Sequence, residues 1–80
     1  SPPACDMKIK ILFFAALREH MQKSEMTVEL ARGESVSAVA HRVTNLERGL
    51  AFAVNDELVH ADHTLNDGDT LALIPPMAGG

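Results

Sequence analysis

Apolar and polar side chains alternate along the first patterned segment of the chain, which begins at residue 7. One side of this segment carries only apolar residues, namely Met7, Ile9, Ile11 and Phe13. A period of two predicts a β-strand, because successive side chains of a strand point to opposite faces. The other side begins with Lys8 and Lys10 and becomes apolar at Leu12 and Phe14. We therefore expect the end of this strand either to be buried by the rest of the fold or to bind a partner.

Two further segments are predicted before the middle of the chain. Residues 15–21 are good helix formers and place Leu17 four positions before Met21, which predicts a short helix. Residues 25–30 alternate again and predict a second strand. Its inward-facing side chains are Met26, Val28 and Leu30. The two strands are expected to form a hairpin with a long connection.

The main helix is predicted after a turn at residues 31–34. Ser35 is a suitable N-cap, and the apolar residues that follow it recur at the spacing of one helix face. These residues are Val36, Val39, Ala40 and Val43. We expect this apolar stripe to face a sheet.

The second half of the chain contains strand patterns and no helix pattern. We predict strands over residues 50–54, 58–60 and 70–74, separated by a turn at 55–57 and a polar loop that ends at Asp69. This order of elements predicts an α+β fold in which one main helix packs across one face of a mixed sheet. The first and last strands are the most apolar, so we expect them to lie side by side at the centre.

Length, charge and cysteine usage limit the function. The 80 residues, 46% of them hydrophobic, suffice for one small domain. We assign residues 1–6 to a vector remnant or disordered extension, residues 7–74 to the domain and residues 75–80 to an extended tail. The lone Cys5 excludes an internal disulfide and fits a reducing compartment.

The same composition bears on the kind of partner. A net charge of −4 without a basic cluster argues against nucleic acid as a ligand. No apolar run approaches the roughly 20 residues that span a bilayer. We therefore expect protein partners, with neither nucleic acid nor a membrane among them.

Candidate metal and catalytic groupings are weak. The segment 60–63 holds two histidines and an aspartate, whereas a zinc site needs three or four well-placed ligands. Residues 66–69 do not align with a calcium loop; we predict a tight turn in which Asp67 caps its own backbone and Gly68 has a positive φ. Ser35, Ser37 and His41 lack an orienting acid. We therefore predict no metal and no bound cofactor.

The tail carries the informative chemistry. It follows the last strand at Ile74 and consists of Pro75, Pro76, Met77, Ala78, Gly79 and Gly80. Two prolines cannot continue a sheet ladder and favour an extended exit. The two glycines lack side chains, which suits a tail that enters a narrow passage in another protein. The terminal carboxylate is the reactive group of this tail, so Gly80 is the predicted chemical site.

Three parts of the chain resemble the small-subunit family of molybdopterin synthase, a group of ubiquitin-like sulfur carriers. These parts are the opening Ile-Leu-Phe-Phe-Ala-Ala-Leu-Arg-Glu at 11–19, the segments Ala-Val-Asn at 53–55 and Asp-His-Thr-Leu-Asn-Asp-Gly-Asp at 62–69, and the ending Pro-Pro-Met-Ala-Gly-Gly at 75–80. The resemblance spans residues 7–80 and implies a ubiquitin-like β-grasp fold, which agrees with the predicted order of elements.

The resemblance also implies a mechanism and a set of partners. Gly80 would be adenylated by an E1-like activating enzyme that uses ATP and then converted, with a sulfur donor protein, to a C-terminal thiocarboxylate (1-thioglycine). The sulfur would pass to cyclic pyranopterin monophosphate in the large synthase subunit. The chain would be a non-catalytic subunit of a cytoplasmic transferase complex.

The implied mechanism also requires residues that contact the partners. Met77, Ala78 and Gly79 would thread into the partner enzymes. The expected partner-binding residues are Leu12, Phe14, Arg18, Ile74, Pro75 and Pro76. Two other functions share the diglycine ending: a sulfur carrier for thiamine or tRNA thiolation, and a ubiquitin-like modifier joined to lysines. An interaction module with an inert tail is a third possibility.

Overall fold

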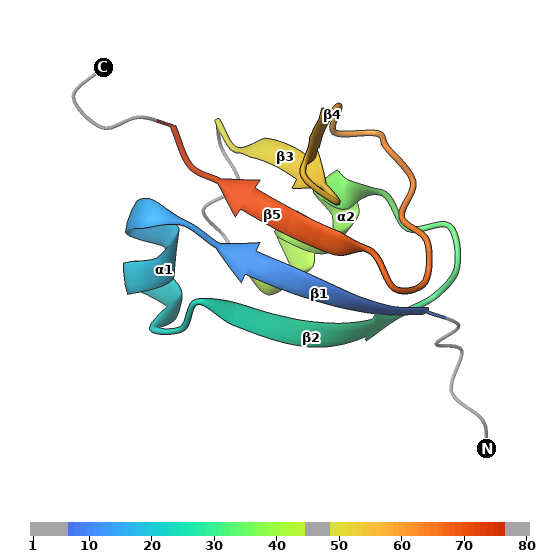
Figure 1. Ribbon diagram of the computed structural model, residues 1–80, viewed down its shortest axis with the longest axis horizontal. Helices are drawn as coiled ribbons and strands as arrows, with labels where there is room; N and C mark the ends of the chain where they lie inside the picture. Colours follow the sequence, from blue (N-terminus) through green and yellow to red (C-terminus); the bar gives the residue numbers. More distant parts are fainter. Residues whose placement is uncertain (1–6, 45–48, 77–80) are drawn as a thin grey trace.

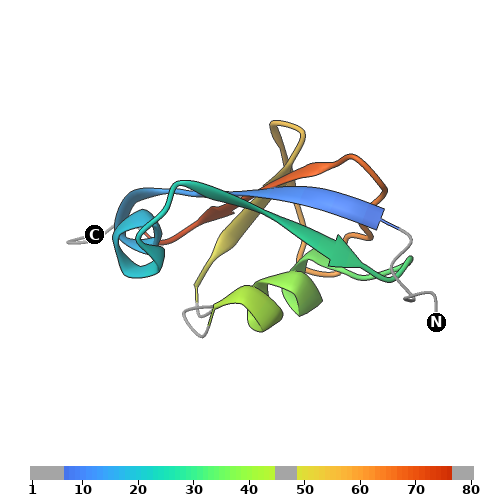
Figure 2. The same cartoon turned by 90° about the horizontal axis from the view of Figure 1, so that it is seen from below.

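The computed structural model describes residues 7–44 and 49–76. Its elements are β1 (Met7–Phe13), α1 (Ala15–Met21), β2 (Glu25–Leu30), α2 (Val36–Val43), β3 (Ala51–Val54), β4 (Glu57–Val59) and β5 (Thr70–Ile74). The strands form one mixed sheet, and α2 packs across one of its faces (Figures 1 and 2). This is the predicted α+β arrangement.

The central pair of strands is the predicted one. The sheet order is β2-β1-β5-β3-β4, so the first and last strands lie side by side in the middle. β1 and β5 run parallel, whereas the other neighbouring pairs are antiparallel. A parallel central pair is typically covered on its faces, and here α2 covers one of them.

The core lies between the sheet and α2. The alternating side chains of β1 that were predicted to face inward are all buried, and those of β5 follow the same alternation. The largest fully buried side chains are Ile9, Ile11, Leu17, Leu30, Val36, Val39, Leu65, Leu71 and Leu73. Leu17 comes from α1, which packs against the ends of β1 and β5. Burial of this single apolar layer is the main stabilising contribution available to so short a chain.

The beginning of α2 is fixed by two kinds of hydrogen bond. The hydroxyl of Ser35 accepts from the backbone N–H of Ala38 at 3.2 Å, which confirms the predicted N-cap. The N–H of Val36 donates to the carbonyl of His63 at 2.9 Å, and the N–H of Ser37 donates to the carbonyl of Ala61 at 3.1 Å. The loop before β5 thus satisfies donors that the first turn of a helix leaves unpaired.

Three strands differ from their predicted bounds by one residue. β1 ends at Phe13 because Phe14, although still extended, is the N-cap of α1 and its carbonyl accepts from the N–H of Leu17 at 3.0 Å. β3 begins at Ala51 and β4 covers Glu57–Val59.

The turn before β5 also departs from the prediction. Gly68 has the expected positive φ, 86°. Asp67 does not cap its own backbone, because its carboxylate accepts from the N–H of Lys8 at 2.8 Å. The turn is closed by Asp69, whose Oδ2 accepts from the N–H of Asn66 at 2.8 Å.

Neither helix in the described part of the chain is long and apolar enough to cross a bilayer.

Candidate functional site

The ends of β1 and β5 meet at one edge of the sheet. The two strands are parallel, and Leu12 pairs with Ala72 and Phe13 with Leu73. Phe14 and Ile74 follow these pairs at the same edge, beside α1 (Figure 1). The two adjacent phenylalanines differ sharply in exposure, at 2% for Phe13 and 42% for Phe14. Phe14 is therefore a surface residue, although its sequence context equally allowed a core position under the short helix.

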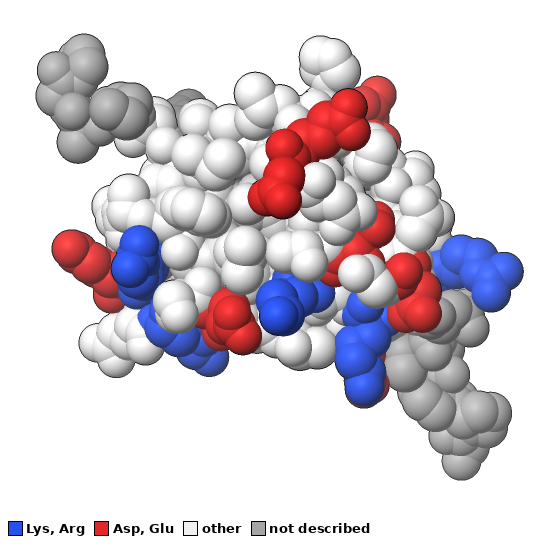
Figure 3. All heavy atoms as spheres, viewed as in Figure 1, with Lys and Arg blue, Asp and Glu red and all other residues white. Residues whose placement is uncertain are grey.

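The sheet face opposite α2 is largely apolar around this edge. One row of paired residues crosses four strands, in the order Leu12, Ala72, Ala53 and Leu58. A second row holds Ile74 paired with Ala51, with Phe14 beyond them. We call these seven residues the apolar face. The view of Figure 3 shows an uncharged area over β3 and β5, bordered by acidic side chains toward β4 and by charges of both signs toward β1 and β2.

Leu58 extends this face beyond what the sequence predicted. Its side chain is 73% exposed, the higher value of the two large hydrophobic residues that the described chain exposes. Small alanines at positions 53 and 72 separate it from Leu12. The signal that could have found it is the tight turn at Asn55 and Asp56, because a two-residue turn places Leu58 opposite Ala53.

The tail leaves the domain at the same edge. The sheet ladder between β3 and β5 ends with the pair Ala51 and Ile74. Ile74 and Pro75 are half-buried and Pro76 is exposed. Because proline has no N–H, the ladder cannot continue past Ile74. The chain therefore departs next to the apolar face.

The remaining predicted site residues divide into two groups. Arg18 is exposed in the last turn of α1, near the edge at which β1 and β5 end. Met77, Ala78, Gly79 and Gly80 lie outside the described residues, so their threading and the chemistry of Gly80 stay predictions. Within the described part, the structure thus brings Leu12, Phe14, Ile74, Pro75 and Pro76 together, with Arg18 at the margin.

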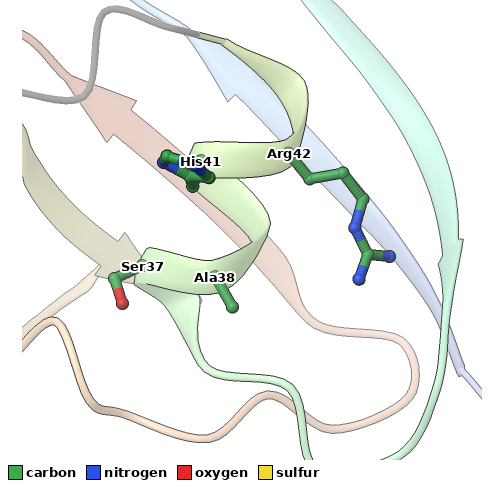
Figure 4. Close-up of a pocket in the computed structure, with 4 residues that line it drawn as sticks. All are labelled: Ser37, Ala38, His41 and Arg42. Atoms are coloured by element: carbon green, nitrogen blue, oxygen red, sulfur yellow. The ribbon is translucent and has the colours of Figure 1, made fainter.

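A separate hollow lies on the exposed side of α2, away from the apolar face. It is lined by Ser37, Ala38, His41 and Arg42 (Figure 4). Arg42 turns away from the other side chains and forms an ion pair with Glu34, with 2.6 Å between Nη2 and Oε2. Among residues 7–44 and 49–76, no three His, Cys, Asp or Glu side chains are grouped closely enough to hold a metal ion.

The fold is that of a ubiquitin-like β-grasp protein, and its last strand leads out beside the apolar face. The ThiS family matches residues 11–80 of the chain. The molybdopterin synthase sulfur carrier subunit of Escherichia coli (strain K12) is 40% identical to this chain, in a match that covers 90% of this chain and 99% of that relative. The chain therefore belongs to the ThiS family, among the molybdopterin synthase sulfur carrier subunits.

Solved structures agree on the fold. Small archaeal modifier protein 1 of Haloferax volcanii superimposes with a TM-score of 0.76 at 17% identity, covering 89% of this chain and 99% of that one. A complex of subunits 1 and 2 of the molybdopterin-converting factor from Helicobacter pylori 26695 contains a chain that matches with a TM-score of 0.63 at 24% identity. That match covers 92% of this chain and all of the other.

Proposed function

We propose that this protein carries sulfur for a molybdopterin synthase and that the carboxylate of Gly80 is the group that carries it. One observation supports the proposal above the others: the parallel β1 and β5 end together, so the apolar face borders the exit of the tail. A carrier that delivers its last residue into an enzyme needs a docking surface beside that residue. In this reading residues 7–74 are the docking domain and residues 75–80 are the delivered tail.

The chemistry at Gly80 begins with activation. A free carboxylate is a poor electrophile, so an E1-like enzyme would join one of its oxygens to the α-phosphorus of ATP and release pyrophosphate. Hydrosulfide supplied by a donor protein would then attack the acyl carbon, and AMP would leave with that oxygen, so that no oxidant or reductant is needed. The product is a thiocarboxylate, written as 1-thioglycine at position 80. ATP is bound by the activating enzyme, and the carrier itself holds no cofactor.

The second half of the cycle takes place in the large synthase subunit. The thiocarboxylate sulfur would act as the nucleophile toward cyclic pyranopterin monophosphate, and water would then cleave the acyl–sulfur bond, which leaves the sulfur on the pterin and restores the carboxylate of Gly80. A dithiolene contains two sulfurs and each carrier brings one, so two charged carriers are needed for each molybdopterin. The spent carrier must leave and be charged again. Both enzymes would act in the cytoplasm.

Docking would use the same surface for both enzymes. Leu12, Phe14, Leu58 and Ile74 offer exposed or half-exposed apolar area, and aromatic and large aliphatic anchors of this kind supply most of the affinity of typical interfaces. Pro75 and Pro76 lie where this surface meets the tail, and Arg18 would form an ion pair at its margin. Because the two enzymes share one surface, they would bind in turn and not together.

The passage of the tail depends on small residues. Met77, Ala78 and Gly79 would occupy a narrow channel that leads to the reacting atoms. Glycine allows other backbone atoms to approach closely, which a side chain at position 79 or 80 would prevent.

The decisive experiment follows the mass of the intact chain. After incubation with the activating enzyme, ATP and the sulfur donor, we expect the mass gain of one oxygen-to-sulfur exchange at the C-terminus. The control is a variant with one alanine added after Gly80, which should fold normally and gain no sulfur. Absence of the exchange in the unextended chain would overturn the proposal.

The same samples separate the alternatives. A charged carrier that does not convert cyclic pyranopterin monophosphate with the large subunit would point to thiamine or tRNA thiolation. A covalent adduct between Gly80 and a lysine of another protein would point to a modifier.

A further inference from the structure

Gly49 and Pro76 lie opposite each other just beyond the sheet. The last pair of the antiparallel β3 and β5 ladder is Ala51 with Ile74. The same register, continued two residues beyond this pair, places Gly49 opposite Pro76. These positions are not part of the ladder, because Pro75 and Pro76 have no N–H to donate. Their relationship is therefore one of packing alone.

The ring of Pro76 faces the side of Gly49 on which a side chain would stand. A Cβ at position 49 would be 3.4 Å from Cγ of Pro76 and 3.8 Å from its Cβ and Cδ. Gly49 also has a φ of 77°, a conformation that glycine adopts at little cost. Gly33 and Gly68 have similar φ values, 91° and 86°, but a Cβ at either would meet nothing within 4 Å. Of these three glycines, only Gly49 is placed so that a side chain would meet the tail.

We propose that Gly49 is a positioning residue that seats Pro76 and sets the direction in which the chain leaves residue 76. The inference rests on the proposed carrier function, for which the tail must find a narrow passage. A proline held against the domain reduces the number of tail orientations, so less conformational entropy is lost when the tail inserts. A Cβ at position 49 would only touch the ring, whereas a side chain that branches at Cβ, as valine does, would crowd it and turn Pro76 away. Gly49 acts through Pro76 and does not touch the reacting atoms.

The kinetic test compares Gly49→Val with Gly33→Val. Both substitutions force a β-branched residue into a positive φ and should lower the melting temperature by similar amounts, but only the first reaches Pro76. In adenylation by the activating enzyme, we expect Gly49→Val to raise KM for the carrier about fivefold with kcat nearly unchanged. Gly33→Val should keep the wild-type KM. Equal KM values for the two variants would overturn the proposal, whether both are raised or neither is.

A double-mutant cycle tests whether the effect passes through the proline. Pro76→Ala removes Cγ and Cδ, two of the three ring atoms that a Cβ at position 49 would meet. We expect Pro76→Ala alone to raise KM, and Gly49→Val to add little in that background. Fully additive effects would show that Gly49 acts by another route and would contradict the inference.

A third measurement needs no enzyme and separates failure of this inference from failure of the carrier function. Residual dipolar couplings of the N–H groups of residues 77–80 report the mean direction of the tail. We expect measurable couplings in the wild type that change in Gly49→Val and Pro76→Ala and persist in Gly33→Val. Near-zero couplings in the wild type, or couplings that Pro76→Ala leaves unaltered, would refute the positioning role even if sulfur transfer proceeds. Pro76→Ala also serves if Gly49→Val does not fold.

Discussion

The side-chain amide of Asn55 donates a hydrogen bond to Oδ1 of Asp69 at 3.0 Å and joins the β3–β4 turn to the turn before β5. Oδ1 of Asn55 in turn accepts from the N–H of Thr70, also at 3.0 Å. The backbone N–H of Asn55 donates to the carbonyl of Thr70 at 2.9 Å. These bonds fix the first residue of β5, the strand whose other end leads into the tail.

Replacing Asp69 should therefore cost stability. Asp69→Ala leaves the Asn55 amide and the Asn66 N–H without their carboxylate partner, and we expect the free energy of unfolding to fall by about 2 kcal/mol. Urea unfolding followed by circular dichroism measures the change. Asp62→Ala, which removes an exposed acid from the preceding loop, should cost less than about 0.5 kcal/mol. Similar losses in the two variants would contradict the role given to Asp69.

Hydrophobic periodicity was sufficient to predict the sheet, because local alternation already encodes which side of a strand is buried. It identified the inward face of β1, the apolar stripe of α2 and the central position of the two most apolar strands. The geometry of the turns was harder to predict from the sequence. Asp67 and Asp69 are near neighbours with identical side chains, and only the position of Lys8 in the folded chain decides that Asp67 bonds to β1 while Asp69 closes the turn.

The candidate site was predicted in part for a similar reason. Leu12, Phe14 and the prolines were found because an apolar residue on a lysine face and a proline after a strand are conspicuous locally. Leu58 was not, because its place beside Ala53 and Ala72 depends on pairings among three strands. The contact of Gly49 with Pro76 likewise requires the register of β3 against β5. The terminal carboxylate already pointed to Gly80 as the reactive residue, whereas the adenylation and the thiocarboxylate assigned to it came from resemblance to a family.

Replacing Phe14 should weaken docking but leave the stability of the domain nearly unchanged. It is the N-cap of α1 but makes no side-chain cap hydrogen bond. In Phe14→Ser, the new hydroxyl adds a cap of about 1 kcal/mol. The loss of the partly exposed ring removes a similar amount of burial energy, about 1 kcal/mol. We therefore expect a net change in unfolding free energy within about 1 kcal/mol.

The docking effect of the same variant should be large. With an anchor of the apolar face removed, KM for the carrier in adenylation should rise about tenfold. Urea unfolding and steady-state adenylation, measured on one preparation, give both values. An unchanged KM would exclude Phe14 from the docking surface, and a loss of stability above about 2 kcal/mol would mean that the ring belongs to the core.

Removing the N-cap of α2 should lower the stability of the domain but leave docking unchanged. Ser35→Ala removes the acceptor of the Ala38 N–H and should lower the unfolding free energy by about 1 kcal/mol. Ser37→Ala is the matched control, because it removes an exposed hydroxyl 3.4 Å from that of Ser35 and leaves the cap acceptor in place. It should change stability by less than about 0.5 kcal/mol. Since α2 packs on the other side of the sheet, both variants should keep the wild-type KM for adenylation. A raised KM in either would place part of the docking surface on α2.

Leu58 provides the sharpest test of the apolar face, because so much of its side chain is exposed. Leu58→Asp gives up little burial and should change the unfolding free energy by less than about 1 kcal/mol. On docking, however, the new carboxylate has to leave water for an apolar contact without a partner, which is strongly unfavourable.

We expect Leu58→Asp to raise KM for adenylation, and Kd for the large synthase subunit, about tenfold or more. Ala38→Asp is the matched control: it adds the same charge to the exposed side of α2, so the two variants have the same net charge. Steady-state kinetics and titration calorimetry measure the two constants. If Ala38→Asp weakens binding as much as Leu58→Asp, net charge and not the apolar face governs docking; if only one enzyme is affected, the two partners do not share this surface.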